Sequence, residues 1–265
     1  MKLSTIERSI TVLGALNMDL IMDLERPAKP GETIMGKKFY TAPGGKGGNQ
    51  AVAAARVSND HSVNFLGAVG NDNYGHELKN YLNNEKVITK EIFIDEKNHS
   101  GIAIIFTDND GENYVNAVYG ANRIKNKSII DSFNKNLDKT KILITQNEMD
   151  KDITKKCMEI ANKSGITIIL DPAPYNESLK NDYYSLADII TPNEIEAEYM
   201  TKIKIKNTFN IIGAAAATPN LLCEFRMAEK NEDKLTNNKK GKVILVNSTA
   251  RLNFILSPIN PGAIK

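Results

Sequence analysis

Short apolar runs alternate with amphipathic stretches along the first two hundred residues. Runs rich in β-branched residues predict buried strands, and longer stretches without proline predict helices. The predicted strands are Ser9–Leu16, Val63–Val69, Gly101–Thr107, Tyr114–Tyr119, Lys141–Thr145, Ile166–Leu170 and Ala187–Thr191, with an alternating edge strand at Ile21–Glu25. The predicted helices are Gly47–Ser58, Tyr74–Asn84, Lys151–Ser164 and Asn193–Met200.

From Lys141 onward strands and helices alternate regularly. This order predicts a mostly parallel sheet with helices on both faces. Ligands of such sheets bind beyond the carboxyl ends of the strands. Polar residues that follow predicted strands are therefore the first candidates for a site: Asn17, Asp19, Glu148, Asp171, Asn193 and Glu196.

The pattern changes after Thr201. Lysine and isoleucine alternate over Lys202–Lys206, Pro219 follows an alanine run, and Glu229–Lys242 is strongly polar. Beyond this point we predict strands only at Val243–Val246 and Leu252–Leu256. We therefore divide the chain into an α/β unit, residues 1–201, and a divergent remainder, residues 202–265.

Composition favours a globular protein with a small-molecule ligand. Hydrophobic residues make up 41% and charged residues 25% of the 265 positions, as in ordinary globular domains. The net charge of +2 gives no broad field that would attract nucleic acid or an anionic membrane. Cys157 and Cys223 have no metal or redox spacing, so we expect reduced thiols. The polar start of the chain and the absence of a long apolar run predict a cytoplasmic location.

A glycine-rich segment, Pro43–Gln50, precedes the first predicted helix with the sequence PGGKGGNQ. Glycines let the backbone approach a ligand, and the start of a helix offers free N–H donors. A nucleotide P-loop needs Ser or Thr after its Gly-Lys pair, and this segment has none. A tight turn before the helix is the alternative to a ligand site.

The order of several motifs resembles the ribokinase family of carbohydrate kinases. The first of them are Asn17-Met18-Asp19, Pro30-Gly31-Glu32-Thr33 and the glycine-rich segment. The similarity continues over residues 10–201 through Gly67–Asp72, Ser100–Ala103, Gly120-Ala121-Asn122, Gln146-Asn147-Glu148, Asp171–Pro174 and Thr191–Glu198. It implies a three-layer ribokinase-like α/β fold with a small β lid formed by residues 21–25, 39–41 and 101–119. Such lids often pair into dimers.

The resemblance also implies roles for individual residues. The sugar hydroxyls would be bound by Asn17, Asp19, Gly45, Lys46, Asn49 and Glu148, since carboxylates and amides suit hydroxyl partners. Asn193 would lie near the nucleotide and Glu196 near Mg²⁺, which usually keeps several of its waters. ATP and Mg²⁺ would be the cofactors, D-ribose the substrate and a homodimer the assembly. The use of a monovalent cation such as K⁺ stays open, and nucleoside kinases and fructokinases share the scaffold.

Each of these residues also has a structural interpretation. Asp19 could be a turn residue, Lys46 a solvated loop charge and Glu148 an acid at a helix start. Asn193 and Glu196 have the spacing of a helix capping box. The three histidines, His61, His76 and His99, stand in polar surroundings and are expected on the surface.

One part of the family pattern is missing. Members carry a Gly-Ala-Gly-Asp helix start whose aspartate acts as the base, and no Gly-x-Gly-Asp follows Thr201. A weak remnant, Asn207-Thr208-Phe209-Asn210, has an amide where the base would stand, so no catalytic residue is assigned. Loss of a positioned base costs about 10² to 10⁴ in rate. The chain is thus expected to be either a kinase whose nucleotide region was removed by a deletion or frame change, or a non-catalytic sugar-binding protein of the same fold.

Overall fold

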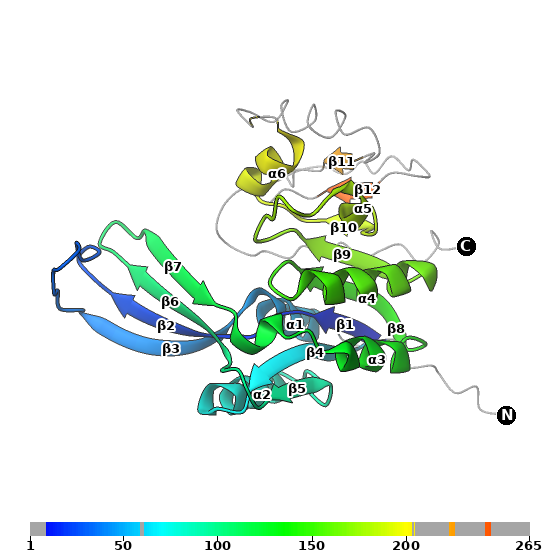
Figure 1. The fold of residues 1–265 in the computed structure, drawn as a ribbon, viewed down its shortest axis with the longest axis horizontal. Coiled ribbons are helices and arrows are strands. Elements are labelled where there is room, and N and C mark those ends of the chain that lie inside the picture. The colour runs from blue at the N-terminus through cyan, green and yellow to red at the C-terminus, as the bar shows by residue number, and fades with distance from the viewer. Residues whose placement is uncertain (1–8, 59–60, 203, 205–222, 226–241, 245–265) are drawn as a thin grey trace.

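A central parallel sheet forms the body of the protein. The structure is a computed structural model that describes residues 9–58, 61–202, 204, 223–225 and 242–244. The strands of this sheet run in the order β11-β12-β10-β9-β8-β1-β4-β5 (Figure 1). Their bounds are β1 Ser9–Leu13, β4 Ser62–Gly70, β5 Ile92–Asp95, β8 Thr140–Gln146, β9 Thr167–Asp171, β10 Ile189–Ile190, β11 Cys223–Phe225 and β12 Lys242–Ile244.

Helices cover both faces of this sheet. Neighbouring residues of one strand point to opposite faces, and β1 shows the result. Val12 packs in the cluster that includes residues of α1 (Lys46–Val57) and α2 (Asn73–Asn84). Leu13 packs in the other cluster, with residues of α3 (Lys127–Lys135) and α4 (Lys151–Lys163). The expected three-layer α/β fold is confirmed.

A second sheet projects from the body (Figure 1). Its four strands lie in the order β3-β2-β6-β7 and are called the β lid below. They are β2 Asn17–Asp23, β3 Lys38–Gly44, β6 Gly101–Thr107 and β7 Asn113–Val118. The remaining elements are η1 Gly120–Arg123, α5 Asn181–Tyr184 and α6 Glu194–Thr201.

The prediction for the first lid strand is wrong. Residues 21–25 were expected to form an edge strand, but β2 spans Asn17–Asp23 and pairs with both β3 and β6. The polar residues Asp19 and Asp23 give this central strand the alternating pattern of an edge strand. The error arises because one face of β2 is polar although both of its sides are paired.

Other differences concern element ends and omissions. β1 stops at Leu13, three residues before the predicted end, and β10 contains only Ile189–Ile190. β5 and α3 were not predicted. α3 is polar except for a narrow apolar stripe that includes the buried Ile129 and Phe133. The predicted strand Leu252–Leu256 lies outside the described residues.

Smaller expectations can also be compared with the described residues. His61, His76 and His99 are exposed as predicted. Cys157 is a buried free thiol, and burial raises its pKa to about 12, so it stays protonated at neutral pH. Within the described ranges, no helix combines the length and the hydrophobicity that crossing a bilayer requires.

Candidate functional site

Asn17 and Asp19 lie on one face of β2, since residues two apart in a strand point the same way. Asn17 stands in register between Gly44 and Gly101, and Asp19 between Ala42 and Ala103. A Cβ added to Gly44 would come within 2.2 Å of an Asp19 carboxylate oxygen. The Asp19 carboxylate therefore occupies the space that a side chain at position 44 would need. The turn interpretation of Asp19 is wrong.

The glycine-rich segment packs tightly against the end of β1. Gly45 is the N-cap of α1 and has a φ of 85°, which side chains other than glycine rarely adopt. A Cβ on Gly47 would lie 2.7 Å from Gly14 Cα. This close approach places Lys46, the first residue of α1, beside the carboxyl end of the central sheet.

Glu148 meets the start of α1. Its Oε2 atom accepts a hydrogen bond of 2.9 Å from the backbone N–H of Lys46. The preceding residue, Asn147, is anchored, because its Nδ2 donates to Pro172 O at 2.7 Å and its Oδ1 accepts from Tyr183 Oη at 3.1 Å. A carboxylate at a helix N-terminus is stabilised by the free N–H groups and by the helix dipole. Lys46 and Glu148, 102 positions apart, thus lie together, and the charge of Glu148 acts on Asp19. These three residues are called the polar cluster below.

The polar cluster contains partly buried carboxyl groups. Burial, and next the charge of Glu148, raise the pKa of Asp19 to about 6. Burial also raises the pKa of Glu148, although the hydrogen bond from Lys46 and the charges of Lys46 and Arg123 act in the opposite direction. Acceptor groups with incomplete solvation are suited to bind the hydroxyl groups of a polar ligand.

Next to the polar cluster lies a chain of side-chain hydrogen bonds that sequence reasoning missed. Gln146 Nε2 donates to Gln50 Oε1 at 2.6 Å, and Gln50 Nε2 donates to Asp171 Oδ2 at 3.1 Å. Burial raises the pKa of Asp171 to about 6, while the charge of Lys46 lowers it. All three residues stand in the family motifs, and Gln50 lies four residues after Lys46, on the same side of α1.

The residues expected on the nucleotide side satisfy one another. Asn193 is exposed, and its side chain accepts from Glu196 N at 2.8 Å. Glu196 is 8% exposed and accepts from Asn193 N at 2.9 Å. The capping box is confirmed. The charges of Glu196 and Glu148 both help to raise the pKa of Asp171, so α6 begins near the polar cluster.

The donor set fits Mg²⁺ only as a partial shell. The described residues contain no group of three or more His, Cys, Asp or Glu side chains that could hold a metal. One carboxylate such as Glu196 can still bind Mg²⁺ that keeps several waters and contacts phosphate oxygens.

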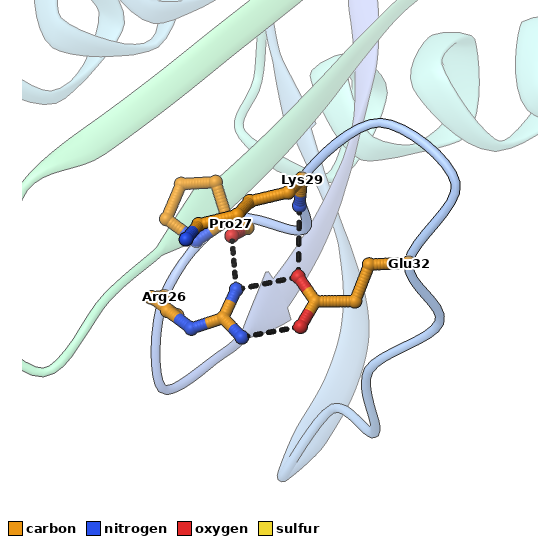
Figure 2. Close-up of polar contacts among 4 residues, drawn as sticks. All are labelled: Arg26, Pro27, Lys29 and Glu32. Carbon is orange, nitrogen blue, oxygen red and sulfur yellow. Dashed lines mark hydrogen bonds and ion pairs between the residues drawn. The ribbon is translucent and has the colours of Figure 1, made fainter.

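Two residues of the family motifs take no part in these contacts. Asn49 is exposed on the first turn of α1. Glu32 lies in the loop between β2 and β3, where it forms an exposed two-pronged ion pair with Arg26 and accepts from Lys29 N at 2.9 Å (Figure 2). The Pro-Gly-Glu-Thr segment is thus held by its own loop.

The sequence profile of the pfkB family of carbohydrate kinases matches residues 7–223. The chain belongs to this family. The sequence of this chain is similar to those of two ribokinases. The enzyme of Haemophilus influenzae is 34% identical over 79% of this chain, and that of Schizosaccharomyces pombe is 35% identical over 71%.

Solved structures agree with the fold. The structure of Arabidopsis thaliana ribokinase complexed with ribose and ATP has a TM-score of 0.71 and 27% identity, and the match covers 79% of this chain and 68% of that one. The fold of this pfkB-family chain is therefore ribokinase-like. The chain spans 67% of the Haemophilus enzyme and 60% of the Schizosaccharomyces enzyme.

Proposed function

We propose that this carbohydrate kinase relative binds D-ribose at the polar cluster, between the β lid and the start of α1. The binding residues are Asn17, Asp19, Gly45, Lys46, Asn49 and Glu148. The convergence of Asp19, Lys46 and Glu148 carries the proposal, because it brings acceptors and a cation to one place at the carboxyl end of the sheet. The ribose in the Arabidopsis complex supports the choice of sugar.

In the family reaction the γ-phosphoryl group of ATP would pass to a sugar hydroxyl and give D-ribose 5-phosphate. Asn193 is the proposed nucleotide contact and Glu196 the proposed magnesium ligand. Bound Mg²⁺ would neutralise charge on the phosphates. The residues of this chain orient the sugar hydroxyls and hold them away from water.

Turnover needs a base, and the sequence after Thr201 lacks the Gly-Ala-Gly-Asp segment. This supports a second candidate function, a non-catalytic sugar-binding protein. We propose residues 1–201 as the sugar-binding unit and residues 202–265 as the divergent remainder of the nucleotide-binding part. Sugar binding is common to both candidates, so they differ only in phosphoryl transfer.

The β lid also supports a proposed homodimer. On the face opposite to Asn17 and Asp19, register brings together apolar residues, of which Phe39, Ile104 and Val118 are 58%, 44% and 58% exposed. Apolar patches of this kind mark association surfaces, and a second copy of the chain would cover both lids at once. Analytical ultracentrifugation of the wild type and Ile104→Glu should give a dimer and a monomer, respectively.

Isothermal titration with D-ribose, followed by a coupled assay of ADP release with Mg-ATP, tests the function. Binding with turnover supports the kinase, and binding without turnover supports the sugar-binding protein. Absence of ribose binding by the folded chain would contradict both. Titration with 2-deoxy-D-ribose and D-fructose, run beside D-ribose, tests the sugar preference.

A further inference from the structure

Asn122 lies where the chain leaves the β lid and returns to the body. It belongs to η1 and is 0% exposed. Its Oδ1 accepts from Leu16 N, and its Nδ2 donates both to Leu16 O and to Asn17 Oδ1, each at 2.9 Å. A buried amide with this many partners holds one orientation, because any rotation would leave polar groups unpaired.

The backbone fixes the polarity of this contact. A backbone N–H can only donate, so the Asn122 atom that faces Leu16 N must be the oxygen. The other Asn122 atom is then the NH₂ group, and the Asn17 atom that it meets must be the oxygen of the Asn17 amide. The NH₂ group of Asn17 consequently points away from Asn122.

Gly101 makes room for the contact. It stands opposite Asn17 in register, on β6. A Cβ at this position would come within 2.1 Å of Asn17 Oδ1 and 2.2 Å of Asn122 Nδ2. Any larger residue would force the two amides apart, so the glycine is part of the same arrangement.

We propose that Asn122 is a positioning residue, which makes Asn17 a hydrogen-bond donor toward the ligand. The inference rests on the proposed sugar site. Within the described residues Asn17 Nδ2 has no hydrogen-bond partner. This nitrogen is not fully buried, so a ligand can reach it. Asp19, on the same face, offers only acceptors when ionised. The pair thus selects hydroxyl groups that accept from Asn17 and donate to Asp19.

A double-mutant cycle on ribose affinity tests this role. Asn17→Ala and Asn122→Ala should each weaken D-ribose binding about 3- to 10-fold, the effect of one neutral hydrogen bond. If Asn122 acts through Asn17, the double variant should lose little more than either single variant. Losses that multiply would overturn the proposal. Asn122→Asp, which keeps the size but cannot donate, should match Asn122→Ala, and Asn126→Ala, on the surface four residues later, should bind as the wild type.

Side-chain amide exchange, measured by NMR on the unliganded wild type, tests the polarity without any sugar. The NH₂ protons of Asn122 should exchange slowly and those of Asn17 rapidly. The reverse order would overturn the proposal even if ribose binds. If the wild type fails to bind ribose, the proposed function fails, but the exchange measurement still tests the Asn122 contact. The measurement also needs no variant, so it holds if Asn122→Ala does not fold.

Discussion

The two polar ends of the site differ in how their side chains use their hydrogen bonds. At one end, Asp19 of the β lid and Glu148, which follows β8, are partly desolvated carboxyl groups with raised pKa values. At α6, Asn193 and Glu196 bond to each other and cap a helix. Burying the carboxyl groups of the first end costs free energy unless a ligand supplies hydrogen-bond partners. The polar groups of the second end already have their hydrogen-bond partners within the protein.

This contrast separates the arguments for the two ligands. The proposed sugar site rests on geometry, because its groups converge and keep free capacity for hydrogen bonds. The nucleotide site depends on family resemblance, since its described residues have a sufficient structural role. The following predictions are arranged from the largest expected effect to the smallest.

Asp19→Asn should weaken D-ribose binding at least about 100-fold at pH 7.5. Each hydrogen bond to a charged group contributes about 1.5 to 3 kcal/mol, and the carboxylate can accept from two hydroxyls. Isothermal titration measures the loss. Asp23→Asn, on the same face of β2 but at its far end, is the matched control and should bind normally. A loss below 3-fold in Asp19→Asn would remove Asp19 from the site.

Asp171 should make the protein less stable as the pH rises. Its folded pKa of about 6 exceeds the ordinary value of 3.8, so between these values the folded state binds more protons than the unfolded state. Stability then falls with increasing pH, by up to about 3 kcal/mol for this group. Urea unfolding of the wild type and Asp171→Asn at pH 4.5 and pH 7.5 measures the difference. Equal pH slopes would contradict a buried carboxyl at this position.

Ribose affinity should increase about tenfold between pH 5 and pH 7.5. The Asp19 carboxyl, with a pKa of about 6, must ionise to accept two hydroxyl donors, and about nine tenths of it is protonated one pH unit below its pKa. Titrations across this range provide the measurement. Asp19→Asn should lack the dependence and Asp171→Asn should keep it; the opposite pattern would assign it to Asp171.

Asn193→Ala should lower the free energy of unfolding by about 1 kcal/mol, the usual cost of a lost N-cap, without changing ribose affinity. Asn126→Ala removes the equivalent cap of α3, where Asn126 accepts from Ser128 N, and should have the same effect. A selective loss of ribose binding in Asn193→Ala would show that the two ends of the site are coupled.

Glu32→Gln should change ribose affinity less than twofold. The ion pair with Arg26 is exposed (Figure 2), and exposed pairs contribute little. A tenfold loss of affinity would show that the loop between β2 and β3 closes on the ligand.

Local signals explain what could be predicted from the sequence. Four glycines followed by alanines located α1 within one residue of its observed bounds, Lys46–Val57. α3 was missed because its apolar stripe is narrow. β2 was misjudged because its two faces differ: one carries Asn17 and Asp19, and the other is apolar and partly exposed.

The contacts of the site could not be predicted in the same way. Asn122 belongs to the family motif Gly120-Ala121-Asn122, but the motif alone indicates no role for it. Only the folded chain brings Asn122 to Asn17, 105 positions earlier. Gln50 and Gln146 meet across 96 positions. Such partners are determined by which strand ends and helix starts become neighbours, and no single segment contains that information.

The most direct test of the sugar site is a titration of ¹⁵N-labelled protein with D-ribose, followed through its backbone amide shifts. The account predicts that the largest shifts occur at Leu16–Asp19, Gly44–Gln50 and Glu148, and that β7 and the exposed end of the β lid stay unchanged. Shifts confined to other surfaces, or none at millimolar ribose, would contradict the proposed site.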